Sequence, residues 1–157
     1  MMIGVMNTPH TDPTASPVPQ PELEAALLGR GWKQRSLGGF IDCAGPLWTR
    51  KEEAGWAYGI LAEDRHLNPA RMVHGGLLET LMDHAVSAIA WEATGRQKCV
   101  TLQMDAHFLA AARKGMFIEA RGHVVHRTAS TLFMQGMLTV DERPILSAQA
   151  LMRIMAA

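Results

Sequence analysis

The sequence lacks the features that define several large protein classes. It has only 2 cysteines, 6% aromatic residues and no net formal charge, with 15 Lys and Arg residues against 15 Asp and Glu residues. Without an excess of positive charge, the chain has no electrostatic footprint for nucleic acid or an anionic membrane surface. No apolar run approaches the roughly 18 residues that a membrane-spanning helix requires. We therefore expect neither nucleic acid nor a membrane as a partner.

The cysteines and the first residues give information about the compartment. Cys43 and Cys99 form no CxxC pattern, and we interpret them as reduced, buried thiols rather than as a disulfide. The apolar stretch 1–6 is too short for the hydrophobic region of a signal peptide and follows no basic residue. Both observations favour a cytoplasmic location.

The composition fits one folded domain preceded by an arm. A chain of 157 residues with 48% apolar residues can bury a core without metal or disulfide support. Five of its 8 prolines lie before residue 22, among Thr, Ser, Asn and Gln. Such a segment cannot bury enough apolar surface to order itself, so residues 1–21 are predicted to be a flexible arm. Residues 22–157 are predicted to form the domain.

Hydrophobic patterning predicts an α+β fold. Pro21 and the acidic residues that follow predict a short helix ending at Gly29. One long helical pattern covers residues 75–94 and is closed by Gly95. The connections between the later strands are short and polar, so successive strands are expected to pair antiparallel. The predicted architecture is an antiparallel sheet of about six strands wrapped around the long helix. The strands are expected at 47–50, 56–60, 100–109, 116–126, 131–140 and 145–154.

The long helix carries two different faces. At 100° per residue, one face is a broad apolar stripe suited to burial against the sheet. The other face, centred on Asp83, has small residues and acids, and residues 73–95 contain no Lys or Arg. This composition favours packing against the same face of a second subunit, and a solvated face is the alternative. The apolar stripe comprises Leu77, Leu78, Leu81, Met82, Ala85, Ala88 and Ile89, and the face around Asp83 comprises Gly76, Glu79, Thr80, Ser87, Ala90 and Thr94.

The residues before this helix suggest an anion site. In His74-Gly75-Gly76, the glycines let backbone N–H groups approach a ligand, and the helix dipole adds positive potential. This can be an oxyanion hole, or a tight turn that needs glycine. Asp83 lies about 12 Å further along the axis, whereas a base and an oxyanion donor must each lie about 3 Å from the reacting centre. Joint action on one carbonyl therefore requires two antiparallel helices from two subunits.

The combined spacing resembles a known signature. Asn68 stands 6 residues before His74, and Asp83 stands 9 residues after it. This pattern resembles that of the hot-dog-fold acyl-CoA thioesterases of the phenylacetate-pathway (PaaI-like) type, and the resemblance covers about residues 45–154. It implies a hot-dog fold assembled as a homodimer, and often as a homotetramer made of two dimers.

The resemblance also implies roles for particular residues. Asp83 would be the general base or nucleophile, and Asn68 would help to hold the attacking water. The Gly75 N–H would bind the thioester oxygen, and His74 would orient the loop and polarise the carbonyl. Thr101, where relatives carry Ser or Thr, would form a hydrogen bond near the acid. Candidate substrate-binding residues are Gly76, Arg71, Glu79, Arg113, Lys114 and Arg127.

Two positions depart from the pattern of the relatives. Glu79 stands one turn before Asp83, where a small or neutral residue is expected. If both carboxylates face the site, their repulsion would raise one pKa, although Glu79 can also face solvent or a partner's arginine. Ala70-Arg71 stands where relatives commonly place a glycine, so Arg71 either meets a CoA phosphate or is simply exposed.

The predicted function is hydrolysis of an acyl-CoA thioester to a free acid and CoA. No HExxH or clustered Cys/His spacing indicates a metal, and no cofactor is expected apart from CoA as part of the substrate. A non-catalytic acyl-CoA-binding or regulatory protein is the alternative from another class. A third hypothesis is an acyl hydratase on the same fold. The sequence does not identify the acyl group.

Overall fold

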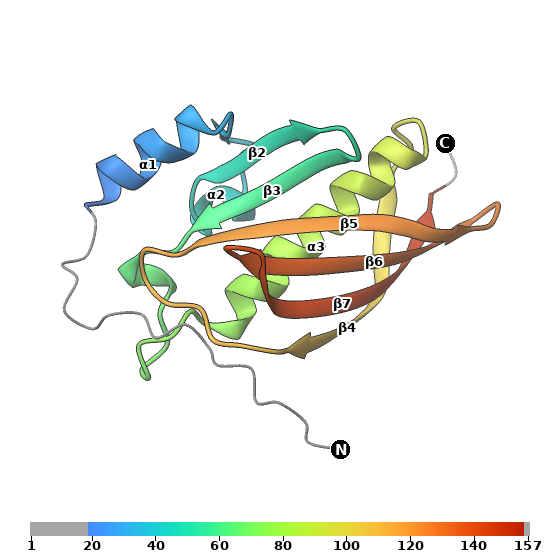
Figure 1. The fold of residues 1–157 in the computed structure, drawn as a ribbon. Coiled ribbons are helices and arrows are strands. Elements are labelled where there is room, and N and C mark those ends of the chain that lie inside the picture. The colour runs from blue at the N-terminus through green and yellow to red at the C-terminus, as the bar shows by residue number, and fades with distance from the viewer. Residues whose placement is uncertain (1–18, 156–157) are drawn as a thin grey trace, which may run out of the picture.

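The predicted long helix is present as α3 (Gly75–Ala93), and one antiparallel sheet curves around it (Figure 1). The computed structural model describes residues 19–155. The sheet has 7 strands in the order β1-β2-β3-β5-β6-β7-β4, which is a hot-dog fold. The strands are β1 (Lys33–Arg35), β2 (Leu47–Glu52), β3 (Gly55–Leu61), β4 (Cys99–Phe108), β5 (Phe117–Arg127), β6 (Thr131–Val140) and β7 (Arg143–Ile154). The other helical elements are α1 (Gln20–Gly29), α2 (Phe40–Cys43) and the 3-10 helix η1 (Asp64–His66).

The six predicted strands and both predicted helices are confirmed, and β1, α2 and η1 are additions. The N-terminal helix begins at Gln20, so Gln20 and Pro21, assigned to the arm from the sequence, form its first turn. Of the predicted arm, residues 1–18 lie outside the described residues. The short elements were missed because segments of three or four residues carry no detectable periodicity.

One predicted strand pairing is wrong. β4 does not pair with β5, which follows it in the chain, but pairs with β7 at the edge of the sheet. β5, β6 and β7 form two successive hairpins and occupy the intervening positions. The connection 109–116 therefore has to pass two strands, running beside the N-terminus of α3, where the Val73 N–H donates to the Ala112 carbonyl at 2.9 Å.

The apolar stripe of α3 packs into the concave face of the sheet, with some shifts from the prediction. Leu77, Ala88 and Ile89 are only half-buried. Ala90 and Thr94, placed on the Asp83 face by the helical wheel, are buried within the same chain. The reason is that the chain reverses after Thr94, whose Oγ1 lies 3.4 Å from the Gln97 carbonyl oxygen. The buried residues of α3 are Leu78, Leu81, Met82, Ala85, Val86 and Ala90.

A glycine pair lets α3 approach the sheet closely. Gly136 of β6 lies opposite Gly122 of β5, under the middle of the helix. A Cβ atom on Gly136 would collide with the sulfur of Met82, and it would lie 3.3 Å from Val86 Cγ1. The helix can sit at this depth because the sheet has no side chain at this position.

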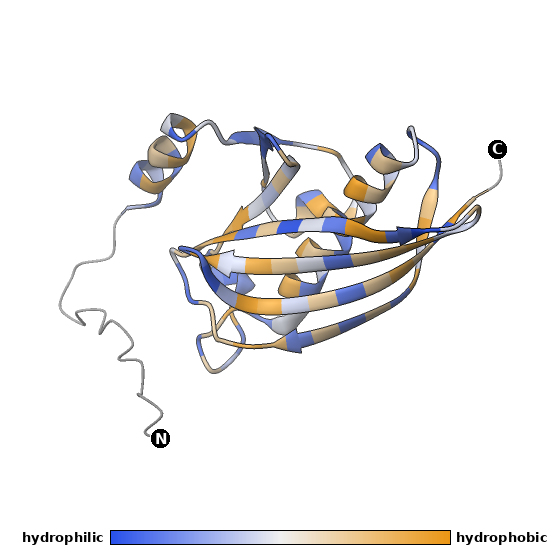
Figure 2. Cartoon of the chain, turned by 45° about the vertical axis from the view of Figure 1, so that its right-hand side comes forward, coloured by the Kyte–Doolittle hydropathy of each residue, from blue (hydrophilic) through white to orange (hydrophobic). Residues whose placement is uncertain are grey.

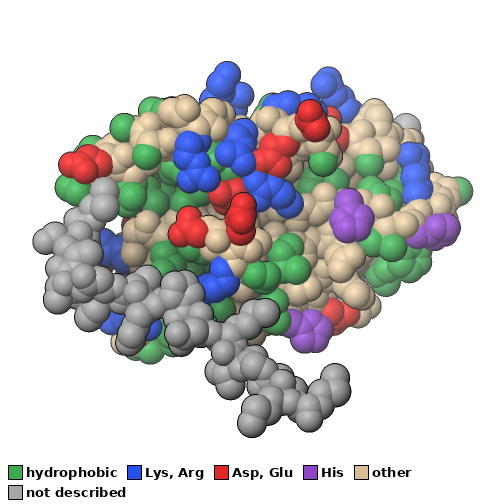
Figure 3. Space-filling view, in the orientation of Figure 1, with side chains coloured by type: hydrophobic (Ala, Val, Ile, Leu, Met, Phe, Trp, Pro, Cys, Tyr) green, Lys and Arg blue, Asp and Glu red, His purple; other side chains and the backbone are tan. Residues whose placement is uncertain are grey.

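The outer face of the sheet has its own small core and a charge cluster. The strands show the alternation of polar and apolar residues expected of a sheet with two different faces (Figure 2). Basic and acidic side chains lie together on one part of the molecular surface (Figure 3). In this cluster Arg121 pairs with Glu52 and Glu119, each at 2.7 Å, and hydrogen bonding from Arg121 lowers the pKa of Glu52 to about 2. The small core under α1 comprises Leu27, Trp32, Trp48 and Ala57, with Phe117 against it.

The cysteine prediction is partly wrong. Cys43 and Cys99 are both free thiols, as expected, but Cys43 is exposed and Cys99 is only half-buried. Cys43 ends the short helix α2, which has no buried residue, so its side chain stays at the surface. In the described part of the chain, no helix is long and apolar enough to cross a membrane.

Candidate active site

The N-terminus of α3 is formed by His74, Gly75 and Gly76. His74 caps the helix, because its Nδ1 accepts a hydrogen bond of 2.9 Å from the Gly76 N–H. With Nδ1 as an acceptor, the neutral ring carries its hydrogen on Nε2 and offers an exposed N–H donor. The Gly75 N–H has no acceptor within residues 19–155. Of the two glycine amides, it is Gly75 that remains free to bind a negatively charged oxygen.

Phe108 of β4 explains why the first helical residue is a glycine. A Cβ atom on Gly75 would lie 3.2 Å from a carbon of the Phe108 ring. The ring is itself 53% exposed, so it covers the glycine from the outside of the molecule. Gly75 thus packs closely against an aromatic ring and also carries the free N–H donor.

The loop before His74 is closed by Asn68. Its Oδ1 accepts from the Met72 N–H at 3.1 Å, and its own N–H donates to the Met72 carbonyl at 2.8 Å. Arg71, within this turn, has a φ of 59°, in the left-handed region that favours glycine. The arginine therefore adopts a conformation that glycine would adopt without strain. The amide nitrogen of Asn68 is left as a donor, since only its oxygen is needed to close the turn.

Asp83 is held by the edge strand. Thr101 Oγ1 on β4 donates a hydrogen bond of 2.7 Å to Asp83 Oδ1 on α3. The second oxygen, Oδ2, accepts no hydrogen bond from any described residue. Asp83 borders a cavity of about 480 Å³, so this second oxygen is available to water or a ligand. The cavity is lined by Phe40, Ile41, Gly76, Glu79, Thr80, Asp83, His84, Ser87 and Met104.

Three of the predicted catalytic residues, Asp83, Asn68 and Gly75, border cavities, and Asp83 borders a different cavity from the other two. Asn68 and Gly75 border a second cavity, of about 300 Å³, together with Phe108. Since α3 is continuous from Gly75 to Ala93, Asp83 lies 8 residues from Gly75, which is about 12 Å along the axis. One chain therefore does not bring Asp83 to the free N–H of Gly75.

The candidate phosphate-binding cations occupy two ends of the molecule. Arg71 and Lys114 both pair with Asp64, Arg71 at 3.0 Å. The hydrogen bonds from Lys114 and Arg71 lower the pKa of Asp64. The Arg113 side chain is exposed next to this cluster in sequence. Arg127 lies elsewhere, because its Nη1 donates to the last carbonyl of α3 at 3.0 Å, at the helix end opposite Gly75.

Two further side chains border the Asp83 cavity, the predicted Glu79 and the unpredicted His84. Glu79 is exposed on its wall and makes no ion pair with any of residues 19–155. His84, which sequence reasoning missed, has its ring edge-on to Tyr58 with the ring centres 5.6 Å apart. Burial lowers the pKa of His84 despite the opposing charge of Asp83. Its position next to Asp83 was the available signal, but adjacency does not reveal which way a helical side chain faces.

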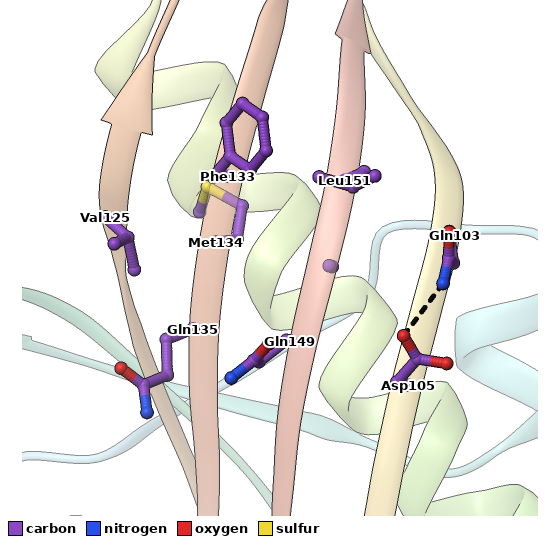
Figure 4. A pocket seen from close by; sticks show the side chains of 9 residues that line it. Gln103, Asp105, Val125, Phe133, Met134, Gln135, Gln149 and Leu151 are labelled. Atoms are coloured by element: carbon purple, nitrogen blue, oxygen red, sulfur yellow. Dashed lines mark hydrogen bonds between the residues drawn. The ribbon is translucent and has the colours of Figure 1, made fainter.

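A further cavity, of about 390 Å³, lies on the outer face of the sheet, away from α3 (Figure 4). Glutamine and apolar side chains line it, and Gln103 donates to Asp105 at 2.8 Å. The sheet separates this cavity from Asp83, so it is not part of the candidate site. Within residues 19–155, no three His, Cys, Asp or Glu side chains cluster in a way that could hold a metal ion.

Comparison with known proteins gives a match to one protein family. The sequence profile of the thioesterase superfamily matches residues 71–146, which include the helix cap, Asp83 and Thr101. Over this stretch the chain is similar to the thioesterase superfamily. Among curated proteins, the chain is 27% identical over 116 residues to the Pseudomonas aeruginosa protein "Putative esterase PA0474", covering 73% of this chain and 87% of that protein.

Solved structures of other proteins share the fold. A hypothetical thioesterase from Streptococcus pneumoniae, solved with coenzyme A, superposes with a TM-score of 0.64 at 21% identity, covering 79% of this chain and 97% of that one. A Ralstonia eutropha protein is named "putative thioesterase, phenylacetic acid degradation-related protein". It superposes with a TM-score of 0.58 at 24% identity, covering 88% of this chain and 92% of that one.

Proposed function

We propose that this protein is an acyl-CoA thioesterase that hydrolyses its substrate to a free acid and CoA. The observation that carries the proposal is the Asp83 carboxylate, held through one oxygen by Thr101 while its other oxygen borders an open cavity. A carboxylate fixed in this way can activate water at a bound carbonyl group. The similarity of residues 71–146 to the thioesterase superfamily supports hydrolysis as the reaction.

The residues supply each step of the reaction. Asp83 takes a proton from water as the water oxygen forms a bond to the thioester carbon. The negative charge that develops on the carbonyl oxygen is stabilised by the Gly75 N–H and the His74 Nε2–H. The C–S bond then breaks, and the CoA thiolate takes up the proton, so that Asp83 is regenerated. In a second version, Asp83 attacks the carbonyl directly and water cleaves the resulting anhydride. Labelled oxygen from water enters Asp83 only in this second version.

The site is proposed to be composite, with residues from two subunits. The 12 Å separation along α3 is too long for Asp83 and Gly75 of one chain to act on the same carbonyl. Two antiparallel α3 helices would bring the Asp83 cavity of one subunit to the Asn68 and Gly75 cavity of the other. The assembly we propose is therefore a homodimer, with a dimer of dimers as the larger form. The exposed small residue Gly76 and the exposed acid Glu79 would lie at this junction.

Recognition of the CoA part is assigned to the cations near the start of α3. Arg71 and Lys114 converge on Asp64, so the cluster is already organised, and a phosphate would compete with Asp64 for them. Arg113 adjoins this cluster, whereas Arg127 would contribute only to a ligand reaching the other helix end. Coenzyme A in the pneumococcal structure supports a CoA thioester as the ligand. The free thiols are in keeping with a cytoplasmic location, which we propose as the place of action.

A thiol-release assay over short, medium and aryl acyl-CoAs tests the proposal. Asp83→Asn should lower kcat by about 100-fold or more, since general base catalysis contributes about 10²–10⁴. Asp105→Asn is the matched control, because Asp105 is an exposed aspartate on β4 that borders the outer cavity. Equal rates for Asp83→Asn and the unmodified protein would remove Asp83 from the mechanism. Saturable acyl-CoA binding without any turnover would favour the non-catalytic alternative, and release of water from a 3-hydroxyacyl-CoA with its thioester intact would indicate a hydratase.

A further inference from the structure

A separate apolar cavity adjoins the Asp83 cavity and shares part of its wall. His84 and Ser87 border both spaces. The second space has a volume of about 480 Å³, within the range of about 300–1,000 Å³ typical of small-molecule sites. It follows α3 from His84 to Glu92, a distance of about 12 Å at 1.5 Å per residue. A group that begins at Asp83 can therefore continue along the helix into this space.

The walls of the adjoining cavity are mainly aromatic and aliphatic. Two of the four tryptophans of the chain, Trp56 and Trp91, border it, and Trp91 is 42% exposed. Arg35 and Glu92 are the charged residues of its lining, and they carry opposite charges. The remaining lining residues are Leu37, Leu47, Thr49, Tyr58, His84, Ser87 and Ala88.

The polar side chains in the depth of this cavity are neutral near pH 7. Burial raises the pKa of Tyr58 to about 12, with the charge of Glu92 acting in the same direction. Burial also lowers the pKa of the His84 ring, which packs edge-on against Tyr58. An apolar group would meet two aromatic rings here without having to displace a buried charge. A charged group would lose its hydration beside these two rings, whereas the charges that border the cavity, Arg35 and Glu92, are of opposite sign.

The segment 36–43, a short loop followed by α2, borders both cavities. Leu37 lines the apolar cavity, while Phe40 lines the Asp83 cavity. The loop is held by Asp42, whose carboxylate accepts from the N–H groups of Leu37 and Gly38, each at 3.0 Å. The hydrogen bond from Ser36, with those from this backbone, lowers the pKa of Asp42. The two spaces thus share a wall on α3 and a common border formed by this loop.

We propose that the acyl chain of the substrate occupies this apolar cavity, and that the protein prefers uncharged medium-length acyl chains to acetyl. The inference rests on the proposed thioesterase function and specifies its substrate class. The thioester carbonyl lies beside Asp83, and the chain passes His84 and Ser87 to reach Trp56 and Trp91. Each additional buried methylene is expected to raise kcat/KM about fourfold until the cavity is filled.

Ala88→Phe tests the assignment, since Ala88 projects from α3 into the cavity. The measurement is the ratio of kcat/KM for octanoyl-CoA to that for acetyl-CoA. The unmodified protein should give a ratio well above 100, and Ala88→Phe should reduce it at least tenfold. Ala93→Phe is the matched control, because Ala93 is an exposed alanine of the same helix that borders none of these cavities, and it should leave the ratio unchanged. An unchanged ratio in a folded Ala88→Phe variant overturns the assignment. If thermal unfolding shows that Ala88→Phe does not fold, the same measurement is made with Ala88→Leu.

A binding measurement separates failure of this subsite from failure of the proposed reaction. S-octyl-CoA, a thioether that cannot be hydrolysed, is compared with CoA by calorimetry. Tighter binding of S-octyl-CoA that Ala88→Phe weakens supports the subsite, even if no acyl-CoA is turned over. Hydrolysis combined with equal affinities for S-octyl-CoA and CoA supports the reaction and overturns the subsite. A protein that neither hydrolyses acyl-CoA nor prefers S-octyl-CoA contradicts both.

Discussion

Thr101 Oγ1 on the edge strand β4 donates a 2.7 Å hydrogen bond to Asp83 Oδ1 in the middle of α3. The two residues are 18 positions apart and are brought together because β4 returns along the helix after the turn at Gly95. This bond fixes one carboxylate oxygen and directs the other toward the cavity. The geometry of Asp83 therefore depends on the placement of β4.

Thr101→Val should lower activity while preserving the fold. Valine has nearly the same shape as threonine but cannot donate a hydrogen bond. A hydrogen bond to a charged group contributes about 1.5–3 kcal/mol, so kcat should fall about 10- to 100-fold if the bond is needed in the transition state. Thr101→Ser, which retains the hydroxyl, should keep most of the activity. Steady-state kinetics check this, and a Val variant with full kcat would show that the bond is not needed for catalysis.

Mixing two inactive variants should restore activity if the site is shared between subunits. Asn68→Asp keeps the acceptor for the Met72 N–H but removes the amide donor, and Asp83→Asn removes the base. In a mixed dimer, one of the two sites contains both intact residues. After complete subunit exchange, about a quarter of the unmodified activity should appear, because half of the dimers are mixed. No activity above the sum of the separate variants would indicate a site within one chain.

Gly136→Ala should destabilise the protein. The added methyl group would collide with the Met82 sulfur beneath α3, and overpacking of this kind costs about 1–3 kcal/mol. Gly29→Ala, at the end of α1, meets no atom within 4 Å and serves as the control. There the alanine should be neutral or stabilising, because it lowers the entropy of the unfolded chain. Urea unfolding of the three proteins gives both differences.

The ion cluster on the outer face should make stability depend on acid pH through Glu52. Its pKa is about 2 in the folded protein, against an ordinary value of 4.5, chiefly because Arg121 donates to it. The unfolded chain therefore binds the proton first as the pH falls. The contribution of Glu52 is full above about pH 4.5 and is lost between pH 4.5 and about 2.

Comparison with Glu52→Gln over this range provides the measurement. The unmodified protein should be more stable than the variant by about 1 kcal/mol at pH 7, a modest value because the pair is partly exposed to solvent. The difference should shrink toward zero near pH 2. A difference that stays constant with pH would show that the charge of Glu52 does not stabilise the fold.

The sequence was sufficient to predict the helices and strands that have a long, regular hydrophobic pattern. The apolar stripe on one side and Gly95 at the end gave α3 almost to the residue, and alternating runs gave β5 to β7. The spacing of Asn68, His74 and Asp83 selected the candidate residues through its resemblance to the thioesterase signature. The helix N-terminus and the rise per residue gave the possible anion site at Gly75 and its separation from Asp83.

Contacts between distant segments were decided only by the tertiary structure. The place of β4 beside β7 depends on the two hairpins that occupy the nearer positions, and no local pattern records this. The burial of Ala90 and Thr94 depends on the reversal of the chain over the helix. The 36–43 loop and the apolar cavity along α3 likewise require knowledge of which segments become neighbours. The sequence by itself determined which residues are candidates for the chemistry. The folded chain decided which donors, oxygens and apolar surfaces remain free, because those depend on what packs against them.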